Sequence, residues 1–240
     1  MKKVITLLTV LTVSLVSAQW GQEKIKGNGN IVSKNITTSD YEEIGVAGAF
    51  QVTLIEGNEG KITLKGDENL LNYVIVETNG DELKIKTEKG FYLQPTKGNK
   101  IEIIIPIKEI SAVNLTGSGD IKSAFTLKSD NFKMSLSGSG DINLHLNANN
   151  IDVKLAGSGD IFLKGNCENF EASVAGSGDI DAANLVAKYS KVNVSGSGNI
   201  STNCTELIEA RVAGSGDIEY NGRPKKMDTK VTGSGKIKMI

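Results

Sequence analysis

The sequence predicts an all-β protein, a right-handed β-solenoid made of stacked turns of about 19 residues, with a β-rich amino-terminal portion. The first observation is a four-residue phrase, Gly-Ser-Gly-Asp, that returns seven times with small variation. The copies lie 21, 19, 19, 20, 18 and 19 residues apart and begin at Gly117, Gly138, Gly157, Gly176, Gly196, Gly214 and Gly233. A fixed period of this length is typical of repeat architectures. The second observation is that apolar and polar residues alternate on both sides of each phrase, and a period of two indicates strands.

Residues 1–18 have the pattern of a secretory signal peptide. Lys2 and Lys3 precede an apolar stretch that ends at Val16, and Val16-Ser17-Ala18 is a small-residue cleavage site. A transmembrane helix needs about 20 apolar residues, and neither this stretch nor a later one reaches that length. We therefore expect an exported protein without a transmembrane segment, located in the periplasm, at the cell surface or outside the cell.

The overall composition argues against a nucleic-acid partner. The chain carries 27 basic and 28 acidic residues, so it offers no basic field for a phosphate backbone. Its 27 glycines and only 3 prolines suit tight, repeated turns. The composition is thus that of a stacked β protein and not of a nucleic-acid-binding one.

The two cysteines, Cys167 and Cys204, are expected to remain separate thiols. They lie two turns apart, which is about 10 Å along a stack with a strand spacing of about 4.8 Å. A disulfide requires Cα atoms within about 7 Å of each other. We expect both side chains to pack as small apolar residues.

Residues 19–40 form a polar leader in front of the β-rich part, residues 41–110. The segment Gly27-Asn-Gly-Asn-Ile31 resembles the later phrase and predicts an early turn or a leading strand. Branched and aromatic residues over 44–55 predict one long strand, which is followed by a turn at 56–60 and a strand at 61–65. Asp67 is expected to start a single helical turn.

The second half of the β-rich part predicts a hairpin and a further strand. Asn79-Gly80 is a typical hairpin turn between strands 74–78 and 83–87. A polar excursion over 88–100 carries Phe91 and Tyr92, which could stack on a sugar or cover the end of the core. The strand at 101–105 is expected to stop at Pro106.

Residues 41–240, taken as one domain, resemble the head GIN domain family, whose members are described as putative auto-transporter adhesins. The residues that carry the resemblance are Gly48–Leu54 with Gly57, Glu68–Leu71, Leu83–Ile85 after the Asn79-Gly80 turn, Ile103–Pro106 and the repeated phrase. The resemblance implies an exported, solenoid-like all-β protein. It implies no catalytic residues.

Residues 111–240 are expected to form the repeat solenoid. Alternation places Ile151, Val153 and Leu155 inward and Asp152 and Lys154 outward. The glycines of each phrase form one corner of the turn, and a variable segment forms the opposite corner and absorbs the differences in length. Stacking then aligns an inward isoleucine column: Ile121, Ile142, Ile161, Ile180, Ile200, Ile218 and Ile237.

Polar columns are expected outside the glycine corner, and they hold the candidate ligand-binding residues. These are Asp120, Asp141, Asp160, Asp179 and Asp217, which we call the aspartate column, together with Ser139, Ser158 and Ser177. Neighbouring carboxylates about 4.8 Å apart repel by about 1 kcal/mol in water. Backbone N–H groups of the same turn or serine hydroxyls are expected to relieve this repulsion. Calcium bound at Asp141, Asp160 and Asp179 is an alternative; no other metal and no cofactor is expected.

These features predict an exported, non-enzymatic interaction module that binds a glycan or a surface protein through an extended face of the solenoid, as an adhesin does. One alternative is a structural envelope protein without a ligand. Another is a carbohydrate-active β-helix enzyme with carboxylates on an outer strand face. No carboxylate pair departs from the repeat, and the sole histidine, His145, is expected to be solvated on an outward position without a serine or cysteine partner.

Overall fold

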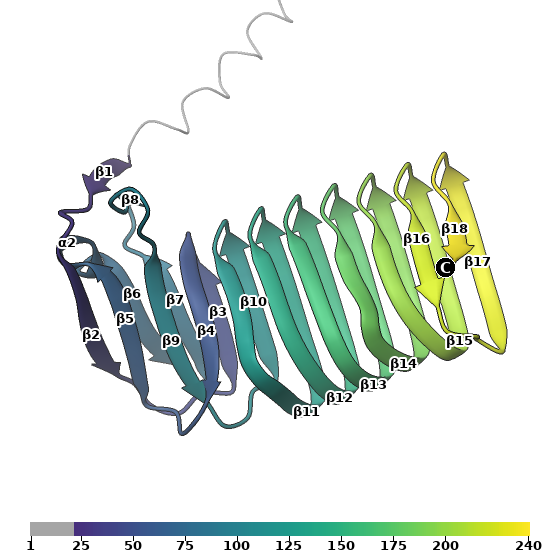
Figure 1. The fold of residues 1–240 in the computed structure, drawn as a ribbon, viewed down its shortest axis with the longest axis horizontal. Coiled ribbons are helices and arrows are strands. Elements are labelled where there is room, and N and C mark those ends of the chain that lie inside the picture. Colours follow the sequence, from purple (N-terminus) through teal and green to yellow (C-terminus); the bar gives the residue numbers. More distant parts are fainter. Residues whose placement is uncertain (1–21) are drawn as a thin grey trace, which may run out of the picture.

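The computed structural model describes residues 22–240 and shows a mostly β protein in which strands stack into one elongated solenoid (Figure 1). The signal peptide expected over residues 1–18 lies outside the described residues. Among the residues described, no helix is long and apolar enough to cross a bilayer. The predicted solenoid with a β-rich amino-terminal portion is confirmed.

The solenoid consists of parallel strands in which each pairs with its equivalent one turn later. In β11–β15 a single strand runs through almost a whole turn, and a two- or three-residue corner separates it from the next. The strands are β10 (Ala112–Gly117), β11 (Asp120–Gly138), β12 (Asp141–Gly157), β13 (Asp160–Gly176), β14 (Ile180–Gly196), β15 (Ile200–Gly214), β16 (Ile218–Asn221), β17 (Lys226–Gly233) and β18 (Ile237–Met239). Parallel pairing in register stacks equivalent side chains on one another.

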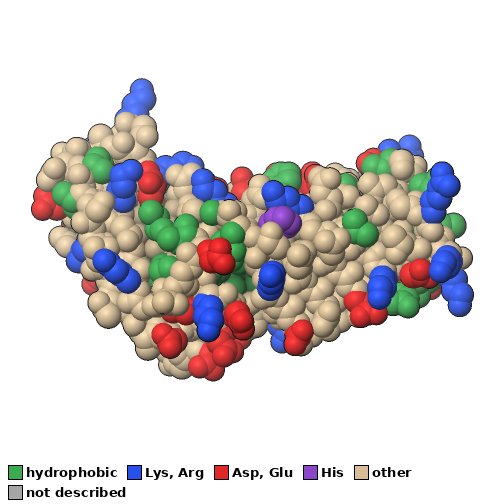
Figure 2. Space-filling view, turned by 60° about the horizontal axis from the view of Figure 1, so that its bottom comes forward, with side chains coloured by type: hydrophobic (Ala, Val, Ile, Leu, Met, Phe, Trp, Pro, Cys, Tyr) green, Lys and Arg blue, Asp and Glu red, His purple; other side chains and the backbone are tan. Residues whose placement is uncertain are grey.

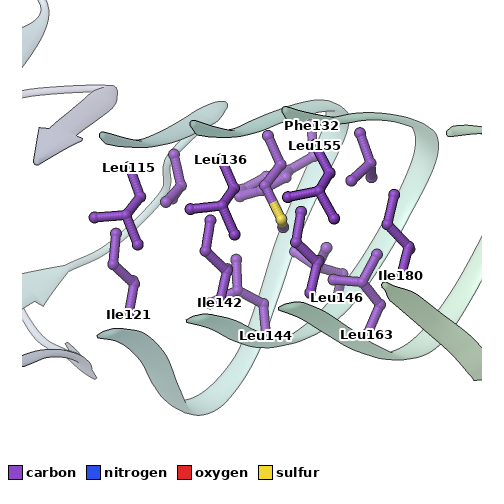
Figure 3. Packing of buried hydrophobic residues seen from close by; sticks show 14 of the residues in the cluster. Leu115, Ile121, Phe132, Leu136, Ile142, Leu144, Leu146, Leu155, Leu163 and Ile180 are labelled. Carbon is purple, nitrogen blue, oxygen red and sulfur yellow. The ribbon is translucent and has the colours of Figure 1, made fainter. Parts of the chain in front are cut away.

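The isoleucine column predicted from the sequence is confirmed. Ile142 pairs with Ile121 on one side and with Ile161 on the other, and the same register continues to Ile237. The column is almost fully buried, with Ile142 and Ile161 both at 0% exposure. Leucines of the opposite wall face it across the core (Figure 3). Each buried aliphatic side chain stabilises the stack by about 1.5–3 kcal/mol.

Both glycines of each phrase are required by the stacking of the corners. Gly157 has φ +128°, a conformation that L side chains rarely adopt. A Cβ atom on Gly159 would overlap the carbonyl oxygen of Gly140 in the turn below. The backbone N–H groups of Ser158 and Gly159 both donate to the Gly138 carbonyl, at 2.9 and 3.1 Å. The corner is therefore a close backbone-to-backbone contact that leaves no room for a side chain at either glycine.

The single long strand expected over residues 44–55 is wrong, because the chain turns a corner within it. Strand β3 (Glu43–Ala47) pairs with β10, and β4 (Phe50–Glu56) pairs with β11. Between them Gly48, with φ +146°, occupies the corner next to Gly117. The apolar alternation continues across the corner, so it reads in sequence as one strand. The stack thus begins before residue 111.

The amino-terminal end of the stack is closed by a change from parallel to antiparallel pairing. The strands and helix here are β1 (Glu23–Lys26), β2 (Ile31–Thr37), β5 (Lys61–Asp67), α2 (Glu68–Leu71), β6 (Val74–Asn79), β7 (Glu82–Thr87), β8 (Phe91–Gln94) and β9 (Ile101–Ile107). Strands β7 and β9 still pair in parallel with β3 and β4, whereas β6, β5 and β2 add on antiparallel. The polar leader therefore supplies leading strands and not a turn of the stack, and the hairpin at Asn79-Gly80 is confirmed.

Two local predictions differ from the structure. Pro106 does not end its strand. It pairs with Ile55 of β4, but on its other side the pairing between β9 and β5 has already ended at Ile104. Pro106 therefore has a paired strand on one side only. The sequence predicts that the differences in length between turns are absorbed at the corner opposite the glycines, but they are not absorbed only there. The register also shifts in the strand just after the glycine corner, for example between Lys122 and Thr126. The corners hold their register by close contact, so the extra residues bulge out between them.

Candidate functional site

The aspartate column lies along one face of the solenoid, where each turn leaves its glycine corner. Asp120, Asp141 and Asp160 open β11, β12 and β13 and pair with one another in register. Asp179 and Asp217 continue the column in the corners before β14 and β16. All five side chains are exposed or half-exposed. The structure therefore brings the predicted residues together.

Four carboxylates of the column, all except Asp120, accept a hydrogen bond from the turn that follows them. The backbone N–H of Asp160 donates to Oδ1 of Asp141 at 3.3 Å, and that of Asp179 donates to Oδ1 of Asp160 at 3.1 Å. The N–H of Lys236 likewise donates to Oδ1 of Asp217 at 2.8 Å. The expectation that the donors come from the carboxylate's own turn is wrong, because stacking brings the next turn's N–H closer. A partner that reaches Asp141, Asp160 or Asp217 would meet the second oxygen, Oδ2, whereas Oδ2 of Asp120 is paired with Nζ of Lys100 at 3.0 Å.

Beside the column the surface is hollowed over about 460 Å³. The hollow is lined by Asp160, Phe162, Asp179, Ile180, Asp181, Asn199, Ser201, Asp217 and Glu219. Five of these side chains are carboxylates, and the Phe162 ring is 42% exposed among them. We call this surface the acidic hollow; it presents negative charge next to one exposed aromatic ring.

The predicted serines lie at the tips of the glycine corners, outside the lining of the acidic hollow. Ser139, Ser158 and Ser177 are exposed, and their backbone N–H groups donate to the glycine carbonyl of the preceding turn at 2.9 Å. Within the described part of the chain, no three His, Cys, Asp or Glu side chains converge in a way that could hold a metal ion.

A second groove, which sequence reasoning missed, crosses the turns at the bend opposite the glycine corner. It has a volume of about 340 Å³. Asn131, Asn150 and Asn169 stack along it, and Tyr189 takes the next place in their register. The signal was present in the sequence, since these asparagines recur every 19 residues like the glycine phrase. We call this surface the asparagine groove.

A third hollow, of about 380 Å³, is lined by loop residues of the amino-terminal part together with Lys128, Ser129 and Asp130 of β11, and it carries both acidic and basic side chains. Figure 2 shows such side chains gathered at the lower edge of this part. Tyr41 is buried at its base and its hydroxyl donates to the Pro106 carbonyl at 2.6 Å. Burial, and then the nearby Glu59 and Asp40, raise the pKa of this tyrosine. The tyrosine is thus held neutral and joins the loop before β3 to strand β9.

His145 lies on an outward position, as predicted, and is half-buried (Figure 2, purple). Its ring nitrogen Nδ1 is 2.8 Å from the hydroxyl of Thr126 in the turn before. Its backbone N–H donates to Ser123 Oγ at 3.0 Å. These contacts lie within the strand stack and make the histidine part of the ladder between turns.

The helical turn predicted at Asp67 is confirmed as α2, but the Asp67 carboxylate does not cap it. The side chain is fully buried and accepts hydrogen bonds from the Gly29 N–H at 2.7 Å and from the Thr96 N–H and hydroxyl at 3.0 and 2.6 Å. Burial alone would raise the pKa of Asp67, but the bonds from Thr96 and Gly29 outweigh it and lower the pKa below its usual value. Asp67 therefore ties the leader to the polar excursion.

The two aromatic residues of the excursion have different surroundings. Phe91 is half-buried and packs on Tyr73, with ring centroids 4.6 Å apart. Tyr92 is 54% exposed, and Nζ of Lys24 lies 5.9 Å from the centre of its ring. Phe91 therefore contacts another aromatic residue of the amino-terminal part, whereas Tyr92 is open to solvent.

Comparisons with known proteins agree with the fold. The model of the family described as "Putative auto-transporter adhesin, head GIN domain" matches residues 40–224. A solved "putative adhesin" of Bacteroides fragilis is similar with a TM-score of 0.83 and 24% identity, over 90% of this chain and 100% of that one.

Two further solved structures are also similar. One is described as a "putative lipid binding protein" of Parabacteroides distasonis, with a TM-score of 0.76 and 28% identity over 91% of this chain and 100% of that one. The other is a "putative adhesin" of Parabacteroides merdae, with a TM-score of 0.76 and 21% identity over 91% and 99% of the two chains. A search among curated proteins gives no match.

Proposed function

Because this chain belongs to the head GIN domain family, described as putative auto-transporter adhesins, we propose that it is an exported, adhesin-like interaction module. It binds a glycan or a surface protein through an extended face of the solenoid and leaves its partner chemically unchanged. The signal-peptide pattern of residues 1–18 supports export to the periplasm, the cell surface or the outside of the cell.

The observation that carries this proposal is the acidic hollow beside the aspartate column. Repeat proteins commonly bind through faces on which equivalent positions of successive turns line up. Here Asp160, Asp179 and Asp217 line one hollow together with Asp181 and Glu219. Carboxylates accept hydrogen bonds from sugar hydroxyls as well as from the ammonium groups of a protein partner.

The Phe162 ring gives the acidic hollow an apolar contact surface. Its 42% exposure is unusual for a phenylalanine, and exposed aromatic side chains are enriched at binding surfaces. An aromatic face between carboxylates attracts both the C–H face of a sugar and a cationic side chain. The carboxylates and the Phe162 ring of the acidic hollow thus suit the same two kinds of partner, a glycan and a protein with cationic side chains.

The experiment is a glycan array probed with the mature chain from Gln19, together with purified surface proteins and phospholipid vesicles, followed by a reducing-sugar assay on every glycan that binds. Binding without product release supports the proposal. Release of reducing ends would identify a carbohydrate-active enzyme, and silence in every arm would identify a structural envelope protein. Binding to vesicles alone would point to a lipid ligand.

Two controls assign the binding to the acidic hollow. The double variant Phe162→Ala and Asp181→Asn removes the ring and one carboxylate of the lining, so it should weaken binding of the partner. Repeating the measurement with calcium and with a chelator tests the calcium alternative at Asp141, Asp160 and Asp179. Full binding by the double variant would place the site elsewhere on the molecule.

A further inference from the structure

We propose that the asparagine groove is a second binding site, separate from the acidic hollow, and that its ligand is a neutral oligosaccharide lying lengthwise along the stack. The groove lies at the other end of the turn from the aspartate column, since Asn150 follows Asp141 by nine residues. It extends over the turns that contribute Asn131, Asn150, Asn169 and Tyr189. This inference does not depend on the acidic hollow.

One wall of the groove is a ladder of side-chain amides. The Asn150 Nδ2 donates to Asn131 Oδ1 at 2.7 Å, and the Asn169 Nδ2 donates to Asn150 Oδ1 at 2.8 Å. An amide has two N–H donors and two acceptor lone pairs, so the ladder uses half of those of Asn150. All three asparagines are exposed. The wall therefore offers donors and acceptors, already fixed in orientation, to a ligand that has both.

The opposite wall carries charges of both signs. Along the register this wall carries, in order, Lys133, Asp152, Glu171, Lys191 and Glu209. Lys191 forms an ion pair with Glu171 at 2.8 Å. Because the signs are mixed, this wall has no strong field for a polyanion or a polycation. It suits an uncharged ligand that is rich in hydroxyl groups.

Tyr189 interrupts the column of asparagines that line the groove, and the stacking of the turns does not require a large aromatic residue at this exposed position. In the preceding turn the exposed position holds Asn169 and the inward position holds Phe170, which is buried. At the equivalent pair the large residue faces outward, with Tyr189 43% exposed, and the small Ser190 faces inward. The buried Ser190 hydroxyl is paired with that of Thr202 at 3.2 Å. At this turn the core therefore contains Ser190 where the preceding turn has Phe170, and the aromatic ring of Tyr189 lines the groove instead.

The spacing of the groove fits a sugar chain. Successive turns are about 4.8 Å apart, which is close to the length of one pyranose unit along an extended glycan. From Asn131 to Tyr189 the groove covers three such steps, about 14 Å. A sugar ring can then stack on Tyr189 while the following units hydrogen-bond to the amides.

The test uses the mature chain and neutral linear oligosaccharides of the cello-, xylo-, manno- and chito-series, with affinities measured by calorimetry. The main variant is Tyr189→Asn, which removes the ring but continues the asparagine ladder and so preserves the fold. The matched control is Val186→Asn, which removes another exposed apolar side chain of the same strand, 41% against 43% exposed, from outside the groove lining. Thermal melting checks the fold of both.

We expect at least one series to bind, with affinity reduced roughly tenfold or more by Tyr189→Asn, as for an aromatic hot spot, and unchanged by Val186→Asn. Tyr189→Phe should retain most of the affinity, since the ring remains. Oligosaccharide binding that survives Tyr189→Asn, or that falls equally in Val186→Asn, overturns the inference. A chain that binds a protein partner but none of these oligosaccharides also overturns it, while the function proposed above stands.

Discussion

The backbone N–H of Asp179 donates to the carboxylate of Asp160, one turn earlier, at 3.1 Å. The same bond links Asp160 to Asp141, and Asn199 replaces a carboxylate as acceptor for the N–H of Asp217 at 2.9 Å. What each turn requires at this position is therefore a side-chain oxygen that accepts the next turn's N–H, and a negative charge is not required. It follows that charge and acceptor function can be separated by mutation.

Asp179→Asn should leave the free energy of unfolding equal to or slightly above that of the native protein. The amide keeps the acceptor for the N–H of Asn199, which lies 2.7 Å from Oδ1 of Asp179, and it removes repulsion of about 1 kcal/mol per neighbouring carboxylate in water. Asp179→Ala should lower the free energy by about 1 kcal/mol, because the acceptor is lost. Urea unfolding of the three proteins measures both effects. Equal losses in the two variants would show that the negative charge matters.

Gly159→Ala should destabilise the protein by about 3 kcal/mol or more, at the upper end of overpacking effects. The added methyl group would overlap the Gly140 carbonyl oxygen, which is backbone and cannot rotate away. Gly80→Ala is the control, since its Cβ meets nothing within 4 Å and the change adds only the strain of φ +62°, about 1–2 kcal/mol. Thermal and urea unfolding compare the two. A Gly159 variant as stable as the Gly80 variant would contradict the stacked corner.

Asp67→Asn should destabilise the protein at neutral pH and reduce the loss of stability in acid. The folded-state pKa of Asp67 is below its usual value, so its contribution is full above the unfolded-state pKa and is lost as the pH falls through the folded-state pKa. Three donors face the carboxylate, and the change should remove about 1.5–3 kcal/mol near pH 7. Urea unfolding from pH 7 down to about pH 2 measures the difference. Asp40→Asn, on an exposed side chain, is the control, and parallel curves for all three proteins would refute the role of Asp67.

Cys167 and Cys204 should titrate as two thiols after unfolding and react slowly in the folded protein. Ala187 lies between them in the register, so they are two strands apart, and both are free. Burial, and then the nearby Cys204, raise the pKa of Cys167 to about 12, so little of the reactive thiolate exists near pH 8. Thiol counting with and without denaturant, and gels with and without reductant, check this. A mobility shift on reduction would show a disulfide that the structure does not contain.

The repeat period and the two-residue alternation were sufficient to predict the solenoid, its isoleucine column and the aspartate column. Ile142 and Asp141 belong to a pattern that recurs every turn, and stacking in register is the arrangement that buries every copy of the first and exposes every copy of the second. Local signals were equally sufficient where one residue type decides the backbone, as at the Asn79-Gly80 hairpin. The corner at Gly48 could have been found by aligning Gly48-Ala49-Phe50 with Gly117-Ser118-Gly119, but unbroken alternation concealed it.

The tertiary structure alone decided which groups meet between turns. That the Asp160 carboxylate accepts from Asp179, that Asp67 binds Thr96 in place of capping its helix, and that Tyr189 faces a groove of asparagines all depend on contacts between residues 19 or more positions apart. A sequence pattern specifies the direction in which a side chain points from its own strand. The partner it meets depends on the spacing between turns and on the bulges that shift their register, and these arise only when the turns pack on one another.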